Sequence, residues 1–200
     1  MHRRPPMIAE DQCHDFEVKD ARDRIRTDER FWGIGGAFTY LICPHCRSWT
    51  LHPKPSDDVL SRHYEGYYPP EEYAQRQKQP VTPVERARAR QVHTTLRSLD
   101  RLESVRTVLD VGTGCGGFLE AFRQGHEANV HGCDQDPASA DLAESLFQIE
   151  VQVGVFDQLN YDEDQFELIT LWHCFEHVRQ PQETLRALKH YLHPNGTLLM

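Results

Sequence analysis

The stretch VLDVGTGCGGF, residues 108–118, decides the fold of this 200-residue chain. Three valines and Leu109 lie within residues 105–111, a composition typical of a short buried strand. Four of the six residues from Gly112 onward are glycines, and the apolar residues that follow recur at helical spacing, which predicts a helix beginning near Gly117. A strand, a glycine turn and a helix start form a ligand cradle. Glycines let the backbone bend sharply and approach a ligand, and the first N–H groups of a helix have no partner within the helix.

Two classes of cofactor use such a turn. Gly112, Gly114 and Gly117 match the G-x-G-x-x-G pattern of dinucleotide sites. Asp110, two residues before the first glycine, favours the other class, because a carboxylate there repels a pyrophosphate but suits a cation. S-adenosylmethionine has no phosphate and carries an ammonium and a sulfonium group. A tight turn with no ligand, as in any α/β protein, is the third interpretation.

The glycine turn closely resembles motif I of the class I S-adenosylmethionine-dependent methyltransferases, which reads roughly D-x-G-x-G-x-G. Asp110, Gly112, Gly114 and Gly116 occupy its defined positions. The resemblance implies that these four residues bind S-adenosylmethionine. It implies the same for the two residues between the glycines, Thr113 and Cys115.

The sequence around the turn alternates between strand-like and helix-like runs. Strands are expected over 128–133, 149–153, 166–172 and 197–200, and helices over 84–102, 137–147 and 181–192. The alternation predicts an α/β fold with a doubly wound, Rossmann-like parallel sheet, behind a small N-terminal β-ribbon. By the same resemblance such a domain has two further strands, so a chain that stops at Met200 is expected to be a fragment with weak activity on its own.

Further cofactor residues are expected where the next strands end. Asp134 lies 20 residues beyond Gly114 at the end of the second expected strand, where an acidic residue can accept hydrogen bonds from ribose hydroxyls. NAD enzymes share this feature, so it supports nucleoside binding without choosing between the classes. The resemblance adds Gln135 and Asp157 near the adenine, and it places Trp172 and His173 in the lining of the cofactor pocket.

The segment after the fourth expected strand carries histidines that could act in catalysis. It ends in Glu176-His177-Val178, as this segment does in the resembled family. His173 and His177 are the candidate catalytic residues. With Glu176 they also spell H-x-x-E-H, which indicates a zinc peptidase only on a long helix, and the position just after a strand argues against one. A further hypothesis, from some quinone-pathway O-methyltransferases that end this segment similarly, is that Glu176 and His177 hold a divalent ion.

The N-terminal segment carries a metal-like knuckle. Cys43 and Cys46 have the C-x-x-C spacing of half a tetrahedral zinc site on a tight turn between two short strands, 37–43 and 48–51. The segment resembles the zinc-ribbon-like piece ahead of some bacterial sugar and small-molecule methyltransferases. Cys13, thirty residues earlier, is the expected third ligand. A ribbon without metal is the alternative. The fourth ligand stays open among several residues: Glu10, His14, His45 and His52.

Composition limits the partners. Residues 1–106 carry 18 Lys and Arg against 16 Asp and Glu, whereas residues 107–200 carry 4 against 15. The acidic charge of residues 107–200 disfavours binding to the phosphate backbone of a nucleic acid. The sequence has no signal peptide at its start and no membrane-spanning apolar run, so a cytoplasmic location with no membrane partner is expected.

Together these features predict three parts, namely an N-terminal zinc-ribbon-like module over 1–74, a linker and leading helix over 75–105, and a methyltransferase domain over 106–200. The expected reaction is methyl transfer from S-adenosylmethionine to a small-molecule or sugar-type acceptor. The alternatives are an NAD(P)-dependent oxidoreductase and a non-catalytic zinc-ribbon binding module on a degenerate methyltransferase scaffold.

Overall fold

The computed structural model describes residues 19, 21–28, 37–54, 56 and 70–200. The chain divides into two compact units, residues 1–67 and 68–200.

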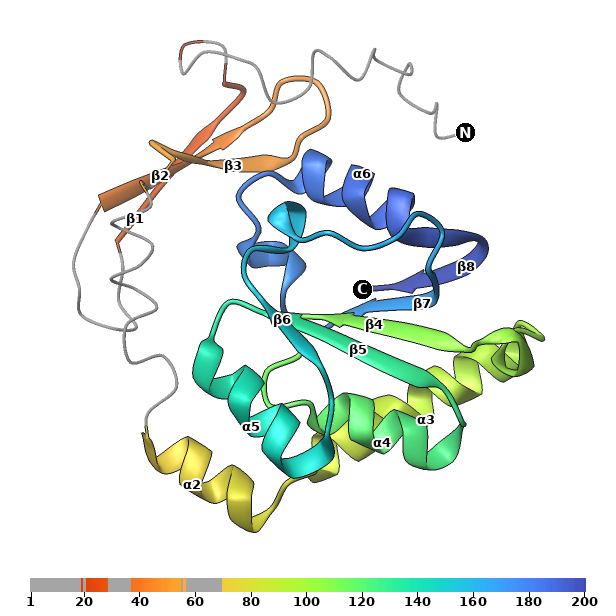
Figure 1. The fold of residues 1–200 in the computed structure, drawn as a ribbon. Coiled ribbons are helices and arrows are strands. Elements are labelled where there is room, and N and C mark those ends of the chain that lie inside the picture. Colours follow the sequence, from red (N-terminus) through yellow and green to blue (C-terminus); the bar gives the residue numbers. More distant parts are fainter. Residues whose placement is uncertain (1–18, 20, 29–36, 55, 57–69) are drawn as a thin grey trace. The chain divides into compact units, whose positions relative to one another are not determined.

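The first unit contains a three-stranded antiparallel sheet in the order β1-β2-β3 (Figure 1). The expected ribbon is present as β2 (Ala37–Ile42) and β3 (Trp49–His52). Strand β1 (Arg24–Asp28) was not predicted, because its sequence RIRTD has a single apolar residue in a strongly charged stretch. Its register pairs Ile25 with Tyr40.

The second unit is the predicted Rossmann-like α/β domain. Its parallel sheet has the order β6-β5-β4-β7-β8, so the chain starts in the middle, builds outward to β6 and then crosses to the other side. The strands are β4 (Thr107–Val111), β5 (Asn129–Asp134), β6 (Val151–Val153), β7 (Phe166–Leu171) and β8 (Leu192–Leu199). This is the arrangement of a doubly wound fold, in which ligands bind outside the carboxyl ends of the strands where the strand order reverses.

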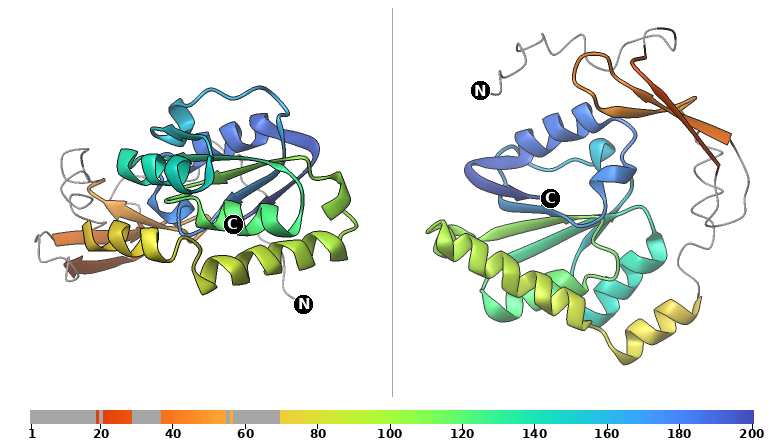
Figure 2. Two further views of the ribbon diagram at one scale, coloured as in Figure 1. Left: turned by 60° about the horizontal axis from the view of Figure 1, so that its bottom comes forward. Right: turned by 180° about the vertical axis from the view of Figure 1, so that it is seen from behind.

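Helices cover both faces of this sheet, as Figure 2 shows from two further sides. One face carries α3 (Pro83–Ser98), α4 (Gly117–Gly125) and α5 (Pro137–Phe147), and their core includes Leu96, Phe122 and Val108. The other carries α6 (Pro181–Tyr191), which packs with Leu109, Phe166 and Ile169. Three short 3₁₀ helices complete the unit, namely η3 (Leu102–Ser104), η4 (Phe156–Gln158) and η5 (Phe175–His177). Strand β4 is buried almost throughout, as a strand covered on both faces must be.

Two local expectations differ from the structure. A linker was expected to begin at residue 75, but helix α2 spans Pro70–Lys78. Its acidic first turn and basic last turn suit the helix dipole. The last strand was expected over 197–200, but β8 begins at Leu192. Leu192 pairs with Phe166 and Thr197 with Leu168, so a bulge separates two registers. Among the described residues, no helix has the length and apolarity needed to cross a bilayer.

Candidate functional site

The glycine turn, Asp134 and the segment after β7 lie at the same edge of the parallel sheet. The turn follows the carboxyl end of β4, Asp134 ends β5, and Trp172 follows β7. The register pairs β4 directly with both β5 and β7. Parallel pairing therefore brings together three pieces that are 20 to 60 residues apart in sequence.

The glycines at positions 112, 114 and 116 are favoured by a common backbone conformation and, at two of them, by close packing. Gly112, Gly114 and Gly116 have φ values of 74°, 53° and 77°, a region that side chains disfavour. A Cβ on Gly112 would lie 3.0 Å from Cys174 Sγ, and one on Gly116 would lie 3.1 Å from the Ala143 methyl group, so these two also serve close packing. A Cβ on Gly114 would meet nothing within 4 Å. The backbone at Gly114 therefore faces open space.

Asp134 lies directly at this open point. Its Oδ2 accepts a 2.7 Å hydrogen bond from the Gly114 amide, and its Oδ1 accepts one of 3.0 Å from the Asp136 amide. Partial burial raises the pKa of the Asp134 carboxyl, while these two amides lower it. The structure thus brings Asp134 to the glycine turn and orients the carboxylate with backbone donors.

Asp110 is buried beneath the turn, with an exposed fraction of 2 %. Its Oδ1 accepts a 2.6 Å hydrogen bond from the Thr170 hydroxyl. Burial raises the pKa of the Asp110 carboxyl to about 7, and the charge of Asp134 raises it too, whereas Thr170 and Arg88 act in the opposite direction. A cation bound nearby would favour the ionised form of the Asp110 carboxyl.

Thr113 and Cys115 point their side chains into the protein. The Thr113 methyl group fills the space beside Gly132, and the Cys115 thiol lies 3.9 Å from the Ser139 hydroxyl. Both residues are buried. The side chains of these two predicted cofactor residues are therefore packed inside the protein, and only their backbone remains part of the turn surface.

Trp172 packs against the helices beside the site. Its ring packs edge-on against Phe118, with centroids 5.6 Å apart, and the Arg88 guanidinium lies 5.4 Å from its centroid. Its indole N–H is buried and has no hydrogen-bond partner among the described residues. Buried donors of this kind are ordinarily satisfied, and a bound ligand is one way to do so.

The two candidate catalytic histidines are exposed. His173 has a φ of 51°, unusual for a residue with a side chain, and its side chain is 78 % exposed. Its Nδ1 lies 3.7 Å from Glu176 Oε1. Glu176 and His177 lie in η5, a three-residue 3₁₀ helix. Residues 175–177 therefore form a short 3₁₀ helix, whereas a zinc peptidase needs a long helix here.

The remaining predicted site residues are Gln135, Asp157 and three cysteines. Gln135 is exposed beside Asp134. Asp157 lies in η4, but its side chain is outside the described part of the chain, as is all of Cys13. Cys43 is fully buried, whereas Cys46 is exposed with its sulfur 2.7 Å from the Ser48 hydroxyl. Within the described residues, no group of three or more His, Cys, Asp or Glu side chains could hold a metal ion.

Sequence reasoning missed the contribution of the two leading helices. The Glu85 carboxylate would lie 2.5 Å from a Cβ on Gly117, so it stands against the start of α4. It accepts hydrogen bonds from Arg76, at 2.7 Å, and from the Thr82 amide and hydroxyl. The T-x-x-E pattern of this capping box is readable in the sequence, whereas its position beside Gly117 is not.

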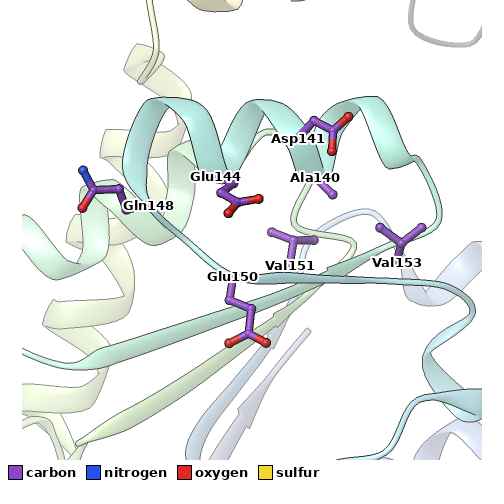
Figure 3. Close-up of a pocket in the computed structure, with 7 residues that line it drawn as sticks. All are labelled: Ala140, Asp141, Glu144, Gln148, Glu150, Val151 and Val153. Atoms are coloured by element: carbon purple, nitrogen blue, oxygen red, sulfur yellow. The ribbon is translucent and has the colours of Figure 1, made fainter.

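A separate hollow of about 460 Å³ lies between α5 and β6 (Figure 3). Its lining residues are Ala140, Asp141, Glu144, Gln148, Glu150, Val151 and Val153. None of the predicted cofactor residues belongs to it. Three carboxylates on an open edge of the sheet form an acidic surface rather than a cofactor pocket.

Comparison with known proteins gives the site its chemical context. Residues 84–200 match the sequence family described as a methyltransferase domain. The chain is 33 % identical over 102 residues to a ubiquinone biosynthesis O-methyltransferase of Pseudomonas paraeruginosa, covering 48 % of this chain and 43 % of the relative. It is 32 % identical over 96 residues to the enzyme of that name from Coxiella burnetii, covering 46 % and 41 %. The chain thus spans less than half the length of these curated relatives.

A solved structure supports the fold. The chain superimposes on a candidate S-adenosyl-L-methionine-dependent methyltransferase of Methanococcus maripaludis with a TM-score of 0.53 and 14 % identity, covering 64 % of this chain and 62 % of that protein. At this identity the likeness concerns the architecture alone. It confirms the α/β class read from the sequence.

Proposed function

Because the chain belongs to the methyltransferase-domain family, whose members depend on S-adenosylmethionine, we propose that the protein transfers a methyl group to a small-molecule acceptor, sugar intermediates included. The observation that carries the proposal is the open backbone at Gly114 with the Asp134 carboxylate hydrogen-bonded beside it. A nucleoside placed there would meet a backbone that can be approached closely and an acceptor for its hydroxyls.

The charge of the site favours S-adenosylmethionine over a dinucleotide. Asp110 is buried beneath the turn and Asp134 lies at its mouth, so a pyrophosphate at Gly114 would approach two carboxylates. A cationic ligand would instead be attracted by both. The oxidoreductase alternative is therefore disfavoured by electrostatics as well as by family membership.

The roles of the chain's own residues follow from their positions. S-adenosylmethionine, when bound, supplies a methyl group on a sulfonium that is itself the leaving group. The glycine turn and Asp134 would hold and orient the nucleoside, and holding two reactants in line is the main contribution that such a reaction needs. His173 and His177, exposed after β7, are the candidates to accept a proton from an acceptor hydroxyl. The names of the curated relatives favour an oxygen as the methylated atom.

The test is isothermal calorimetry of the protein with S-adenosylhomocysteine and with NAD⁺, followed by mass spectrometry of small molecules methylated in a host extract. Binding of the first ligand alone and a mass gain of one methyl group in an extract component are expected. Tight NAD⁺ binding without S-adenosylhomocysteine binding would refute the proposal. Cofactor binding without any methylated product would favour the non-catalytic alternative.

We also propose that Cys43 and Cys46 bind zinc together with Cys13. The support is the tight turn that joins β2 to β3, in which the Cys43 carbonyl accepts a hydrogen bond from the Arg47 amide and the Cys43 amide donates one to Ser48. Such a turn presents two thiols from neighbouring positions. Metal analysis of protein purified without added zinc should give about one ion per chain, and Cys43→Ser should abolish it. Stoichiometry near zero in the unsubstituted protein would refute the site.

A further inference from the structure

Helix α2 precedes the part of the chain that matches the methyltransferase family, yet its side chains contact residues at the starts of α5 and α3, close to the candidate site. Tyr73 and Arg76 are three residues apart, so they lie on one face of the helix. Tyr73 donates a 2.5 Å hydrogen bond to Asp136 Oδ2, and Arg76 donates one of 2.7 Å to Glu85 Oε1. These two polar contacts reach the beginning of α5 and, through Glu85, the beginning of α4.

The Tyr73 contact continues to the predicted ribose ligand. Asp136 is the N-cap of α5, and its carboxylate accepts hydrogen bonds from the Ala138 and Ser139 amides. The Asp136 amide in turn donates to Asp134 Oδ1. A movement of the Asp136 side chain therefore changes the backbone that orients the Asp134 carboxylate.

Among the described residues, the hydrogen bonds of Tyr73 and Arg76 join α2 to the rest of its unit. The remaining side chains of α2 from Glu71 to Lys78 are exposed, apart from a partly exposed Glu72. Burial, followed by the hydrogen bond to Asp136, raises the pKa of Tyr73 to about 12, so the phenol stays a donor throughout the neutral range. A helix attached by a few polar contacts can be released without loss of the hydrophobic core.

From this geometry we propose that Tyr73 is a positioning residue for cofactor binding, acting through Asp136 on Asp134, and that α2 is a latch whose closure is coupled to occupancy of the ribose site. The inference rests on the proposed role of Asp134. Tyr73 lies outside the matched domain. The affinity for the nucleoside would therefore depend on a helix that reaches the glycine turn only through Asp136 and Asp134. Cofactor binding should therefore also order α2, because the coupling is reciprocal.

The experiment compares the whole chain with its Tyr73→Phe variant, which keeps the ring and removes only the donor. Calorimetry uses S-adenosylhomocysteine and its 2′,3′-dideoxy analogue, which lacks the ribose hydroxyls. Tyr73→Phe should weaken S-adenosylhomocysteine roughly 3- to 10-fold, the effect of one lost hydrogen bond, and leave the dideoxy analogue within about twofold. Tyr40→Phe, on the antiparallel sheet of the first unit, is the matched control and should change neither affinity.

Hydrogen exchange supplies a second readout. Amides of residues 70–78 should exchange more slowly when S-adenosylhomocysteine is bound, and faster in ligand-free Tyr73→Phe than in the ligand-free unsubstituted protein. An unchanged affinity in Tyr73→Phe, or equal weakening of both ligands, would refute the positioning role. If the unsubstituted protein binds no S-adenosylhomocysteine, the proposed function fails and the positioning role fails with it. Exchange of the ligand-free proteins then still decides whether Tyr73 holds α2 in place.

Discussion

The central strand of the parallel sheet and the central strand of the antiparallel sheet bury their side chains very differently. In β4, Val108, Leu109 and Val111 are all at or below 2 % exposure, because helices cover both faces of that sheet. In β2, Leu41 is buried but Tyr40 is 37 % exposed, and Trp49 on the neighbouring strand is 56 % exposed. Ile25, Tyr40 and Trp49 gather on one face of the antiparallel sheet, where the Tyr40 and Trp49 rings lie 6.0 Å apart.

This difference shows where each unit obtains its stability. The parallel sheet and its helices enclose two hydrophobic cores of their own. A three-stranded sheet with an exposed apolar face buries much less, and small domains of that kind commonly need a metal or a covering surface. The proposed zinc at the Cys43–Cys46 turn would supply the first of these.

Truncation of one apolar side chain in each sheet should show the largest contrast. Leu109→Ala removes a fully buried side chain and should lower the free energy of unfolding by about 3 kcal/mol. Trp49→Ala removes a half-exposed ring and should cost less than about 1 kcal/mol in the same measurement. Urea denaturation, followed by circular dichroism, gives both values. Equal costs would mean that Trp49 is covered in solution and that the contrast between the sheets is smaller than the exposures indicate.

Asp110→Asn should stabilise the ligand-free parallel unit as the pH rises. The folded chain holds the Asp110 proton more tightly than the unfolded chain does, since the pKa is raised to about 7 from the ordinary value near 4. The wild-type group therefore costs nothing below about pH 4 and progressively destabilises the fold as the pH rises toward 8. Asparagine carries no charge and still offers an oxygen to Thr170.

The expected advantage of Asp110→Asn over wild type grows to about 4 kcal/mol at pH 8, is about 1 to 2 kcal/mol at pH 5 and nearly vanishes below pH 4. Denaturation curves at several pH values measure it, and Glu183→Gln on α6 is a control with an exposed carboxylate. The variant should lose affinity for S-adenosylhomocysteine although it is more stable. A difference that does not change with pH would show that Asp110 titrates normally.

Substitution of Gly114 within the glycine turn should give a small change in stability and still a clear change in binding. Gly114→Ala adds a methyl group that meets nothing within 4 Å, so only the strain at a φ of 53° remains, about 1 kcal/mol. Gly116→Ala carries the same strain and also presses on Ala143, so it should cost more. Thermal unfolding compares the two stabilities, and calorimetry measures the affinity. Gly114→Ala should weaken S-adenosylhomocysteine more than its stability loss predicts, and an unaltered affinity would remove Gly114 from the cradle.

The sequence by itself determined the parallel sheet and the place of the cradle. Strand, glycine turn and helix are local signals, since a buried parallel strand reads as an apolar run and a left-handed backbone calls for glycine. For the same reason helix α5 was predicted with its exact limits, Pro137 to Phe147, from a proline at its first turn and the apolar pattern that follows. The meeting of Asp134 with the turn could be anticipated, because parallel pairing places strand ends at one edge.

Only the tertiary structure decided the rest of the site. The burial of Asp110, the inward turn of Thr113 and Cys115, and the separate reasons for Gly112, Gly114 and Gly116 depend on which atoms of distant segments come near them. The contact between Tyr73 and Asp136 joins residues 63 positions apart, and no local pattern records it. Backbone preferences act between neighbours along the chain and can be read in order. A pKa, a hydrogen bond across the fold or a space left open for a ligand arises from packing, which exists only after the chain has folded.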